Sequence, residues 1–471
     1  MRHLVILFIF IHNLSFCQNF ESCQFISCDD KEIKDAYNLA INTVEINVRR
    51  GILAAGGDYG GEWTRDIAIN SWNAVSLLYP NIAENSLWSV TINKDSVGHQ
   101  YWDKIIWVIS AYNHYKATGK IDFLKQAYRC SANTMKQMEQ SVYDTLYGLF
   151  KGPSVFNDGI AGYPIPIYDT LVQSSSVFDH PNTYKIKCLS TNCIYYGAYL
   201  SLIEMARILE IDTSTITSYQ AKANNLKNNI IKHLYDPSQN SFYYLTDQLG
   251  NKIKYQEGLG ISFAIIFGII ENNQAKKIIN NLYISNYGIT SIWPNFNYFS
   301  DEKPGRHNNL IWPMVNGFFA QACIKAGNYN AFLHEFKSLT HLAIDPDKGD
   351  YNFREIYDPI TGKPEGGWQC GIHWTSCKYQ TWSATAYLNM VLYGLVGIRL
   401  ENNKIFFQPY LPSSIGQISI NNIKYQEAEL SITIKGSGTK IKKFILNGKK
   451  QSIPVLSKNL KGSNRIVIEM Q

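Results

Sequence analysis

The sequence predicts a mainly α-helical fold, a ring of helical hairpins followed by a small antiparallel β module. From about residue 31 to 398, apolar residues recur with a helical period. Short connections alternate there with long loops rich in glycine and aromatic residues, as expected when hairpins form a ring and the long loops gather on one face. From about residue 401 the pattern changes to short alternating runs separated by Gly, Pro and Asn-Gly, which indicates strands and turns.

The N-terminus, MRHLVILFIFIHNLSFCQNF, is typical of a secretory signal peptide covering residues 1–17. A basic residue precedes an apolar run from Leu4 to Ile11, which is too short to span a membrane. We therefore expect export, either to a periplasm or to the outside. A lipid anchor on Cys17 is an alternative, but the bulky residue before Cys17 fits that signal poorly. No other stretch approaches about 18 uninterrupted apolar residues, so we expect no membrane span.

Eleven segments after the signal peptide have the apolar periodicity of helices. They are Lys31 to Arg49, Arg65 to Leu78, Tyr101 to Ala117, Ile121 to Val142, Thr191 to Leu209, Ser214 to Leu234, Glu257 to Ile270, Gln274 to Leu282, Asn309 to Ala326, Asn328 to Leu342 and Gln380 to Tyr393. The loops between them, such as KGPSVFNDGIAGYP and YNFREIYDPITGKPEGGWQCGIHWTS, are far longer than usual connections and are expected to carry function.

Composition narrows the class of ligand. The 471 residues are 45% hydrophobic and 17% charged, which is ordinary for a globular protein, but the aromatic fraction of 13% is high. Aromatic rings pack cores, and they also stack on the C–H faces of sugars. The net charge of +6 is spread without a run of like charges, so neither a nucleic-acid partner nor a basic membrane patch is expected.

The cysteines suit an exported chain. Without Cys17 an even number remains, at positions 23, 28, 130, 188, 193, 323, 370 and 377. Such a count permits disulfides, and Cys23/Cys28, Cys188/Cys193 and Cys370/Cys377 are close enough in sequence for local bridges. None of them has the two-residue spacing of a zinc site, so we expect no metal and no cofactor.

Carboxylates in the long loops are the candidates for chemistry, because nucleotide-binding loops, zinc-protease helices and nucleophile elbows are absent from the sequence. The carboxylates flanked by Trp, Tyr or Gly are Glu62, Asp66, Asp103, Asp158, Glu257, Glu355, Asp358 and Glu365. Two carboxyl groups across a pocket are the minimum apparatus for breaking a glycosidic bond, and an aromatic setting would raise the pKa of the acid. Each also has a structural explanation, such as an Asx turn at Asp158, and spacing alone does not choose.

Three motifs resemble those of six-hairpin, (α/α)6-toroid glycoside hydrolases. GGEWTRD resembles the Trp-x-Arg-Asp segment of families 15 and 63 and of bacterial debranching-type relatives. FREIYDPITG, followed by EGG and HWTS, is similar to segments of family 63 glucosidases and family 37 trehalases, and QTWSATAYLNMVLYGLVGI resembles the closing helix of these toroids. The order of the motifs covers most of residues 31 to 471. The resemblance implies an (α/α)6 catalytic domain over residues 18–398 and a β-sandwich-like module over residues 399–471.

The resemblance also implies roles for single residues. Asp158 matches the general acid of the middle loop, and Glu355 matches the general base. The residues implied or predicted to bind the substrate are Trp63, Arg65, Asp66, Trp102, Asp103, Glu365 and Trp374. The chain departs from the family pattern at Thr64, where family 63 usually has Gly, and at Phe156, where it usually has Trp, and the trehalase QWD signature is missing.

From this resemblance we expect an exo-acting, inverting glycoside hydrolase that releases a terminal α-linked neutral sugar, of the glucose or mannose type, from an oligosaccharide or polysaccharide. We expect a monomer. One alternative is a carbohydrate-binding toroid without turnover. Another is a uronate lyase on the same fold, for which Arg306, His307 and Tyr357 are available.

Overall fold

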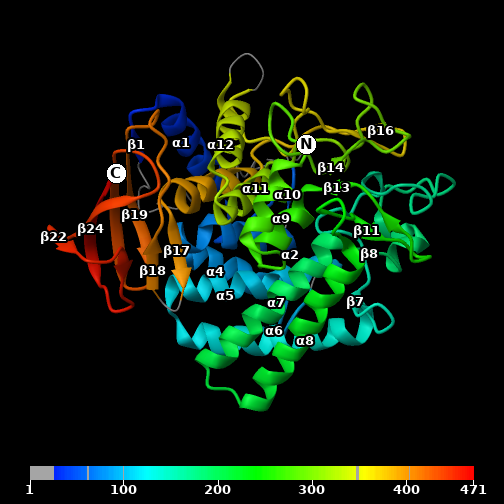
Figure 1. Ribbon diagram of the computed structural model, residues 1–471, viewed down its shortest axis with the longest axis horizontal. Coiled ribbons are helices and arrows are strands. Elements are labelled where there is room, and N and C mark those ends of the chain that lie inside the picture. The colour runs from blue at the N-terminus through cyan, green and yellow to red at the C-terminus, as the bar shows by residue number, and fades with distance from the viewer. Residues whose placement is uncertain (1–25, 61–62, 99, 346–349, 402–403) are drawn as a thin grey trace, which may run out of the picture.

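A computed structural model describes residues 26–60, 63–98, 100–345, 350–401 and 404–471. The helices form an (α/α)6 toroid, and the C-terminal strands form a separate layer at one side of it (Figure 1). The predicted signal peptide, residues 1–17, lies outside the described residues, as do Cys17, Cys23 and Glu62. Within the described residues, no helix combines the length and apolarity needed to cross a bilayer.

Six helices form the inner ring, and each contacts the next until the last closes on the first. They are α2 (Thr64–Asn70), α5 (Ile106–Thr118), α7 (Leu189–Ile208), α9 (Gly258–Ile266), α11 (Pro313–Ala326) and α13 (Thr381–Asn389). Every residue of α2 and α13 is buried, and the other inner helices are buried along nearly their whole length. Helices that are apolar on all sides are stable only in such surroundings, so their sequences place them inside.

The outer helices are amphipathic and cover the inner ring. They are α1 (Lys31–Ile46), α4 (Pro80–Ser89), α6 (Ile121–Val142), α8 (Thr213–Leu234), α10 (Asn272–Asn280) and α12 (Tyr329–Ile344). The bounds of α6 agree with the prediction from sequence. The ten-residue α4 was not predicted, because it is too short to show a clear period and begins with Pro80, which usually marks a break but is well accommodated at the first helical position.

Two predicted inner helices are less regular than the sequence suggested. The segment from Arg65 to Leu78 contains a π-helical turn, Ser71–Val75, between α2 and α3 (Ser76–Leu78). The segment after α13 likewise continues as a π-helical turn, Met390–Leu395. Both turns belong to neighbouring helices of the inner ring, which are in contact there. Apolar periodicity does not distinguish a π turn from an α turn, so the sequence could not reveal either one.

Short two-residue strands line the connections of the hairpins. They are β2 (Val48–Arg49), β3 (Ile52–Leu53), β4 (Thr91–Ile92), β5 (Ser96–Val97), β6 (Tyr143–Asp144), β7 (Leu149–Phe150), β8 (Lys187–Cys188), β9 (Tyr235–Asp236), β10 (Ser241–Phe242), β11 (Leu245–Thr246), β12 (Lys252–Ile253), β13 (Gln256–Glu257), β14 (Ile292–Trp293), β15 (Trp368–Gln369) and β16 (Ile372–His373). The long loops with β8, β11, β13, β14 and β16 lie on the side away from the C-terminal sheet (Figure 1).

The C-terminal strands form two sheets. One has the order β1 (Ile26–Cys28), β19 (Gln417–Tyr425), β20 (Ala428–Lys435), β24 (Gly462–Met470), β21 (Ile441–Leu446) and β22 (Lys449–Gln451), and the other has β17 (Ile398–Glu401), β18 (Lys404–Phe407) and β23 (Val455–Leu456). All these pairs are antiparallel except β20 and β24. The sheets meet through Phe407 and Phe444, whose ring centroids are 5.4 Å apart.

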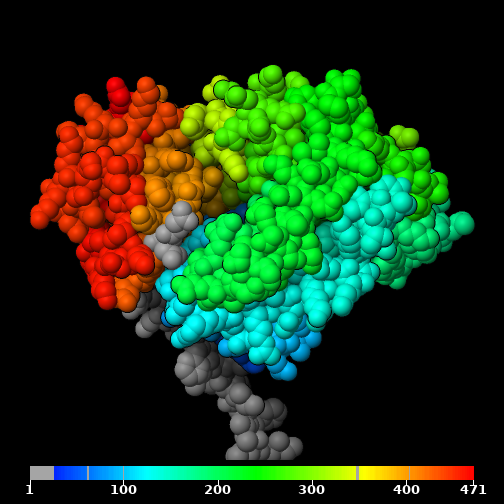
Figure 2. All heavy atoms as spheres, turned by 60° about the horizontal axis from the view of Figure 1, so that its bottom comes forward, coloured from blue at the N-terminus to red at the C-terminus, as the bar shows by residue number. Residues whose placement is uncertain are grey.

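The C-terminal module packs directly on the helical ring (Figure 2). The backbone N–H of Gln426 donates to the carbonyl of Ala117 at the end of α5, and the ring of Tyr410 lies 4.7 Å from that of Tyr329 at the start of α12. β1, which precedes the first helix, pairs with β19. The N-terminal end of the described chain therefore ties the two parts together, a pairing that the sequence did not reveal.

The local disulfides that the cysteine spacing permits do not form where the structure describes both cysteines. Cys188, Cys193, Cys370 and Cys377 are all free thiols. Cys188 precedes α7 and Cys193 is inside it, and residues five apart on a helix point to different sides. The Cys370 thiol contacts the carbonyl of Ser174 instead of Cys377. The remaining pair that the spacing permits, Cys23 and Cys28, includes Cys23, which lies outside the described residues.

Candidate active site

A small cavity of about 70 Å³ lies among the long loops, beside the N-terminal ends of inner helices. Its lining consists of Ala55, Tyr59, Trp63, Arg65, Asp66, Phe156, Asp158, Arg306, His307, Trp312, Glu355, Gln380 and Trp382. A buried water occupies roughly 10–15 Å³ on this measure, so the cavity has room for one small ligand. Five of the predicted site residues, namely Trp63, Arg65, Asp66, Asp158 and Glu355, meet in it although they are up to about 290 positions apart.

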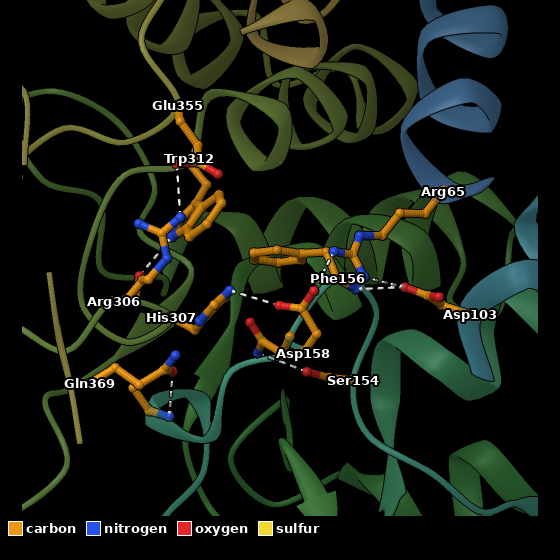
Figure 3. Close-up of polar contacts among 12 residues, drawn as sticks. Arg65, Asp103, Ser154, Phe156, Asp158, Arg306, His307, Trp312, Glu355 and Gln369 are labelled. Carbon is orange, nitrogen blue, oxygen red and sulfur yellow. Dashed lines mark hydrogen bonds and ion pairs between the residues drawn. The ribbon is translucent and has the colours of Figure 1, made fainter. Parts of the chain in front are cut away.

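Arg65 is the electrostatic centre of one half of the cavity. It lies in the first turn of α2, where Trp63 is the N-cap residue. Its guanidinium nitrogens lie 2.6 Å from Asp158, 3.6 Å from Asp103 and 3.9 Å from Asp66. Figure 3 shows Asp158 and Asp103 directed towards the guanidinium group. The helix start therefore fixes one cation among three carboxylates that come from three segments of the chain.

Asp158 is held by Arg65 and His307 rather than by a local turn. One carboxylate oxygen accepts a hydrogen bond from Arg65 at 2.6 Å, and the other lies 3.5 Å from Nε2 of His307 (Figure 3). Burial raises the pKa of Asp158, but the positive charge of Arg65, with a smaller contribution from His307, outweighs it and the pKa is below its usual range. The raised pKa expected for the acid is therefore wrong for Asp158 in this ligand-free state.

The two other carboxyl groups beside Arg65, those of Asp66 and Asp103, are strongly desolvated by burial. Burial raises the pKa of Asp66 to about 7, although Arg65 opposes the shift. Burial also raises the pKa of Asp103, which lies outside the cavity lining. The carboxylate of Asp103 accepts a hydrogen bond from the backbone N–H of Phe156 at 3.0 Å. Asp103 thus links the turn that precedes α5 to the loop that carries Asp158, and it supports the site without lining the cavity.

Glu355 supplies the carboxylate in the other half of the cavity. It lies in the long loop after α12 and is 3% exposed. Arg306 donates a hydrogen bond to it at 2.8 Å, and the hydroxyl of Tyr59 donates another at 2.8 Å. Arg306 in turn donates to the carbonyl of Gly366 and its guanidinium carbon lies 5.3 Å from the ring centroid of Trp312. The carboxylate is therefore held in a fixed orientation at the cavity wall.

Several polar atoms of the cavity lining have no hydrogen-bond partner among the residues that the structure describes. These are Nε and Nη1 of Arg65, Nδ1 of His307, Oε1 of Gln380 and Nε1 of Trp382, all of them buried. Buried polar atoms are satisfied in nearly all native proteins, so such a group of donors with an acceptor points to a polar ligand. Hydroxyl groups can both donate and accept, and a sugar ring presents several of them close together.

Four predicted substrate-binding residues do not line this cavity. Trp102 is 6% exposed in a second hydrophobic cluster, where its indole N–H donates to the carbonyl of Ser154. Asp103 lies behind Arg65. Glu365 accepts hydrogen bonds from the backbone N–H of Gly367 and from His373. Trp374 lies in a neighbouring hollow. These four side chains therefore lie close to the cavity or behind its wall without contributing to its lining.

The sequence did not single out several lining residues as members of this site. Tyr59, Gln380 and Trp382 received no role, and Arg306 and His307 were considered only for a lyase. A common signal exists: like Arg65, Gln380 and Trp382 stand at the N-terminal end of an apolar inner helix. Among the residues that the structure describes, no group of His, Cys, Asp and Glu is arranged to hold a metal ion.

Comparison with known structures shows the same fold. A sialidase has a TM-score of 0.70 at 15% identity over 93% of this chain, and the chain spans only 42% of that sialidase. The GH63 mannosylglycerate hydrolase of Thermus thermophilus has a TM-score of 0.59 at 14% identity, covering 76% of this chain and 100% of the enzyme. A GH78 rhamnosidase of Bacillus sp. GL1 has a TM-score of 0.59 at 12% identity, covering 95% of this chain and 44% of its own.

The sequence itself gives the family. No curated protein sequence matches the chain. The family model for the C-terminal domain of glycosyl hydrolase family 65 matches residues 398–456, which are strands of the C-terminal module. The model for the mannosylglycerate hydrolase MGH1-like glycoside hydrolase domain matches residues 99–383, more than half of the chain and most of the toroid. The chain therefore belongs to the mannosylglycerate hydrolase MGH1-like family of glycoside hydrolases.

Proposed function

We propose that the protein is an exo-acting, inverting glycosidase that removes a terminal α-linked neutral hexose, glucose or mannose, with Asp158 as general acid and Glu355 as general base. The observation that carries this proposal is the convergence of these two carboxyl groups, from loops almost 200 positions apart, on one small cavity. Two carboxyl groups that flank a glycosidic bond are sufficient for its hydrolysis.

The cavity supports an exo mode of action. Its volume of about 70 Å³ suits one sugar ring at the end of a chain better than the interior of a polymer. The unpartnered donors of Arg65 and Trp382 and the unpartnered acceptor of Gln380 match the hydroxyl groups of a neutral sugar. Among solved structures with the same fold, the GH63 mannosylglycerate hydrolase of Thermus thermophilus has been obtained in complex with glucose. That complex supports a neutral hexose in the terminal position.

The proposed reaction uses the two carboxyl groups on opposite sides of the anomeric carbon. Asp158 donates its proton to the glycosidic oxygen while Glu355 accepts a proton from the attacking water, so the bond breaks with inversion. Tyr59 and Arg306 keep the acceptor oxygen atoms of Glu355 oriented throughout. The proton gained by Glu355 returns to Asp158 through solvent after the products leave.

Arg65 influences whether Asp158, the proposed acid, is deprotonated or protonated. In the ligand-free protein its hydrogen bond to Asp158 favours the carboxylate, which is the state after proton donation. When a sugar ring enters the cavity, its hydroxyl groups take up guanidinium N–H donors, and the weakened contact lets Asp158 bind a proton. Asp66, whose pKa burial raises to about 7, lies beside the same guanidinium group and bears on the local proton balance at neutral pH.

The test is a pair of isosteric substitutions with a matched control. Asp158→Asn and Glu355→Gln are each expected to lower kcat on an α-linked disaccharide by roughly 10² to 10⁴, the usual contribution of general acid or base catalysis. Asp358→Asn is the control, because the carboxylate of Asp358 lies in the same loop as Glu355 but accepts hydrogen bonds only within its own turn, from Ile360 and Thr361.

A leaving-group comparison separates the acid from the base. With a 2,4-dinitrophenyl glycoside, whose leaving group needs little protonation, Asp158→Asn should recover most of the lost activity and Glu355→Gln should not. Near-full disaccharide hydrolysis by either variant would reject its assignment. If Asp66→Asn rather than Asp158→Asn shows the selective recovery, Asp66 is the acid.

The uronate lyase receives less support from the geometry. A lyase needs an arginine free to neutralise the substrate carboxylate, but Arg65 is held by Asp158 and Arg306 by Glu355. Tyr357, the proposed alternative base, is fully buried and donates its hydroxyl hydrogen bond to the carbonyl of Asn352. Of the three residues available for a lyase, the cavity lining includes Arg306 and His307 only.

A further inference from the structure

A second and larger hollow, of about 420 Å³, adjoins the catalytic cavity. It is lined by Asp58, Tyr59, Ile372, His373, Trp374, Thr375 and Cys377, and we refer to it as the Trp374 hollow. Tyr59 lines both spaces, and its hydroxyl group donates the hydrogen bond to Glu355. A molecule whose terminal ring occupies the catalytic cavity can therefore extend past Tyr59 into the Trp374 hollow.

Trp374 is an exposed ring on a fixed backbone. It follows the β15–β16 hairpin and is 39% exposed, unusual for so large an aromatic side chain. Its backbone is pinned by Gly366, where a Cβ atom would lie only 1.8 Å from the Trp374 carbonyl oxygen. The guanidinium carbon of Arg306, itself held by Glu355, lies 5.2 Å from the ring centroid. Rigid, exposed aromatic rings are suited to stacking on the apolar face of a sugar.

The charges around the Trp374 hollow disfavour an anionic ligand. Among the described residues no lysine or arginine lines it, whereas Asp58 contributes a carboxylate. Its one basic side chain, His373, is bound to Glu365 at 2.5 Å. Of the cations nearby, Arg306 is bound to Glu355, Lys378 lies 3.5 Å from Asp350, and the guanidinium group of Arg49 donates to the backbone carbonyls of Gly56 and Tyr59. A small carboxylic acid in this hollow would meet the like charge of Asp58, and no lysine or arginine among the described lining residues compensates that charge.

We propose that the Trp374 hollow binds the leaving group, and that it accepts an uncharged sugar ring rather than a small organic acid. This inference rests on the proposed glycosidase function and names its substrate class as neutral oligosaccharides of two or more rings. The GH63 enzyme of Thermus thermophilus is described as a mannosylglycerate hydrolase and has been obtained with D-glycerate. The present chain is thus predicted to differ from that enzyme in the group it releases.

The experiment compares three substrates that share one glycosyl group, in both the glucose and the mannose series. An α-glycosyl fluoride fills only the catalytic cavity, an α-linked disaccharide adds a neutral ring, and an α-glycosyl glycerate adds a small anion. For the unmodified enzyme we expect kcat/KM for the disaccharide to exceed that for the glycerate by at least tenfold. A preference for the glycerate would overturn the inference.

Trp374→Ala tests the ring directly. This variant should lower kcat/KM for the disaccharide roughly tenfold, the effect of losing one stacking contact. The factor by which kcat/KM falls should be at least five times larger for the disaccharide than for the fluoride. Trp374→Phe should restore most of the loss. Trp293→Ala is the matched control, because Trp293 is 37% exposed but stacks on Tyr283 outside both cavities. Equal losses on fluoride and disaccharide would refute the role of Trp374. Failure to hydrolyse any of the substrates, fluoride included, would instead refute the glycosidase itself.

Asp58→Asn tests the charge. Removing this carboxylate should raise the ratio of kcat/KM for the glycerate to kcat/KM for the disaccharide several-fold, because only the anionic leaving group is repelled. An unchanged ratio between the two substrates would contradict the electrostatic part of the inference.

Discussion

Arg65→Met is expected to destabilise the fold as well as the site, because one guanidinium group lies against three carboxyl groups, of which Asp66 and Asp103 are buried and Asp158 is partly buried. Its nearest contact, with Asp158 at 2.6 Å, corresponds to a Coulomb attraction of about 6 kcal/mol at an effective dielectric constant of 20. Desolvation offsets part of this attraction, and removing one partner of a buried pair typically costs about 3–5 kcal/mol. We therefore expect the free energy of unfolding at pH 7.5 to fall by about 3–5 kcal/mol.

The loss should depend on pH. Without Arg65 the pKa values of Asp66, Asp103 and Asp158 are expected to rise above those of the unfolded chain, since burial already raises the first two and Arg65 is the main group that opposes burial at the third. Carboxyl groups with a raised pKa in the folded state destabilise it increasingly as pH rises through the range between the unfolded and folded values. The deficit should therefore be about 1–2 kcal/mol smaller at pH 5 than at pH 7.5.

Urea denaturation of the unmodified protein, Arg65→Met and Arg65→Lys at both pH values measures this effect. Arg65→Lys keeps the charge and should lose less than half as much stability as Arg65→Met. A deficit below about 1 kcal/mol at pH 7.5, or one that is the same at both pH values, would refute the view that Arg65 stabilises the site by neutralising buried carboxyl groups.

Three further predictions concern other buried groups. Glu335 is fully buried and accepts hydrogen bonds from Asn316 and from the backbone N–H of Ile289, and burial raises its pKa to about 8. The free energy of unfolding should therefore fall as pH rises from about 4.5 to 8. Urea denaturation of Glu335→Gln should show that fall reduced by about 2–4 kcal/mol. Tyr59→Phe removes one hydrogen bond to Glu355 and should lower kcat/KM roughly tenfold without a comparable loss in Tm, and unchanged kinetics would contradict its orienting role. Alkylation in urea without reductant should label both Cys188 and Cys193, whereas a bridge would protect both.

The fold was largely predictable because its inner helices are apolar segments and its motifs resemble those of six-hairpin toroids. The resemblance implied a ring of hairpins, which buries such segments, and the switch to alternating residues after about 401 marks the C-terminal strands. What the sequence did not reveal depends on contacts between distant segments. The pairing of β1 with β19 and the π-helical turn at Ser71–Val75 are examples, because neither leaves a periodic signal in its own segment.

The sequence predicted which loops form the site, but not which of their side chains reach the cavity. Arg65 and Glu355 line the cavity as expected, since each follows or lies in a long loop on one face of the toroid. Trp374 lies in the same loop as Glu355 but lines the neighbouring hollow, and Trp102, in the turn before α5, lies in a hydrophobic cluster. A motif fixes which segment approaches the substrate, whereas packing among neighbouring loops decides which side chain reaches it.

Asp158 and Glu355 are proposed to act across one cavity to hydrolyse an α-glycoside with inversion. Proton NMR of the first minutes of hydrolysis, before the released sugar mutarotates, measures the anomeric configuration of the product directly. The proposed roles predict that the β-anomer of the released hexose appears first from an α-linked disaccharide. Initial release of the α-anomer would show retention, and would contradict the assignment of Glu355 as the base that activates water.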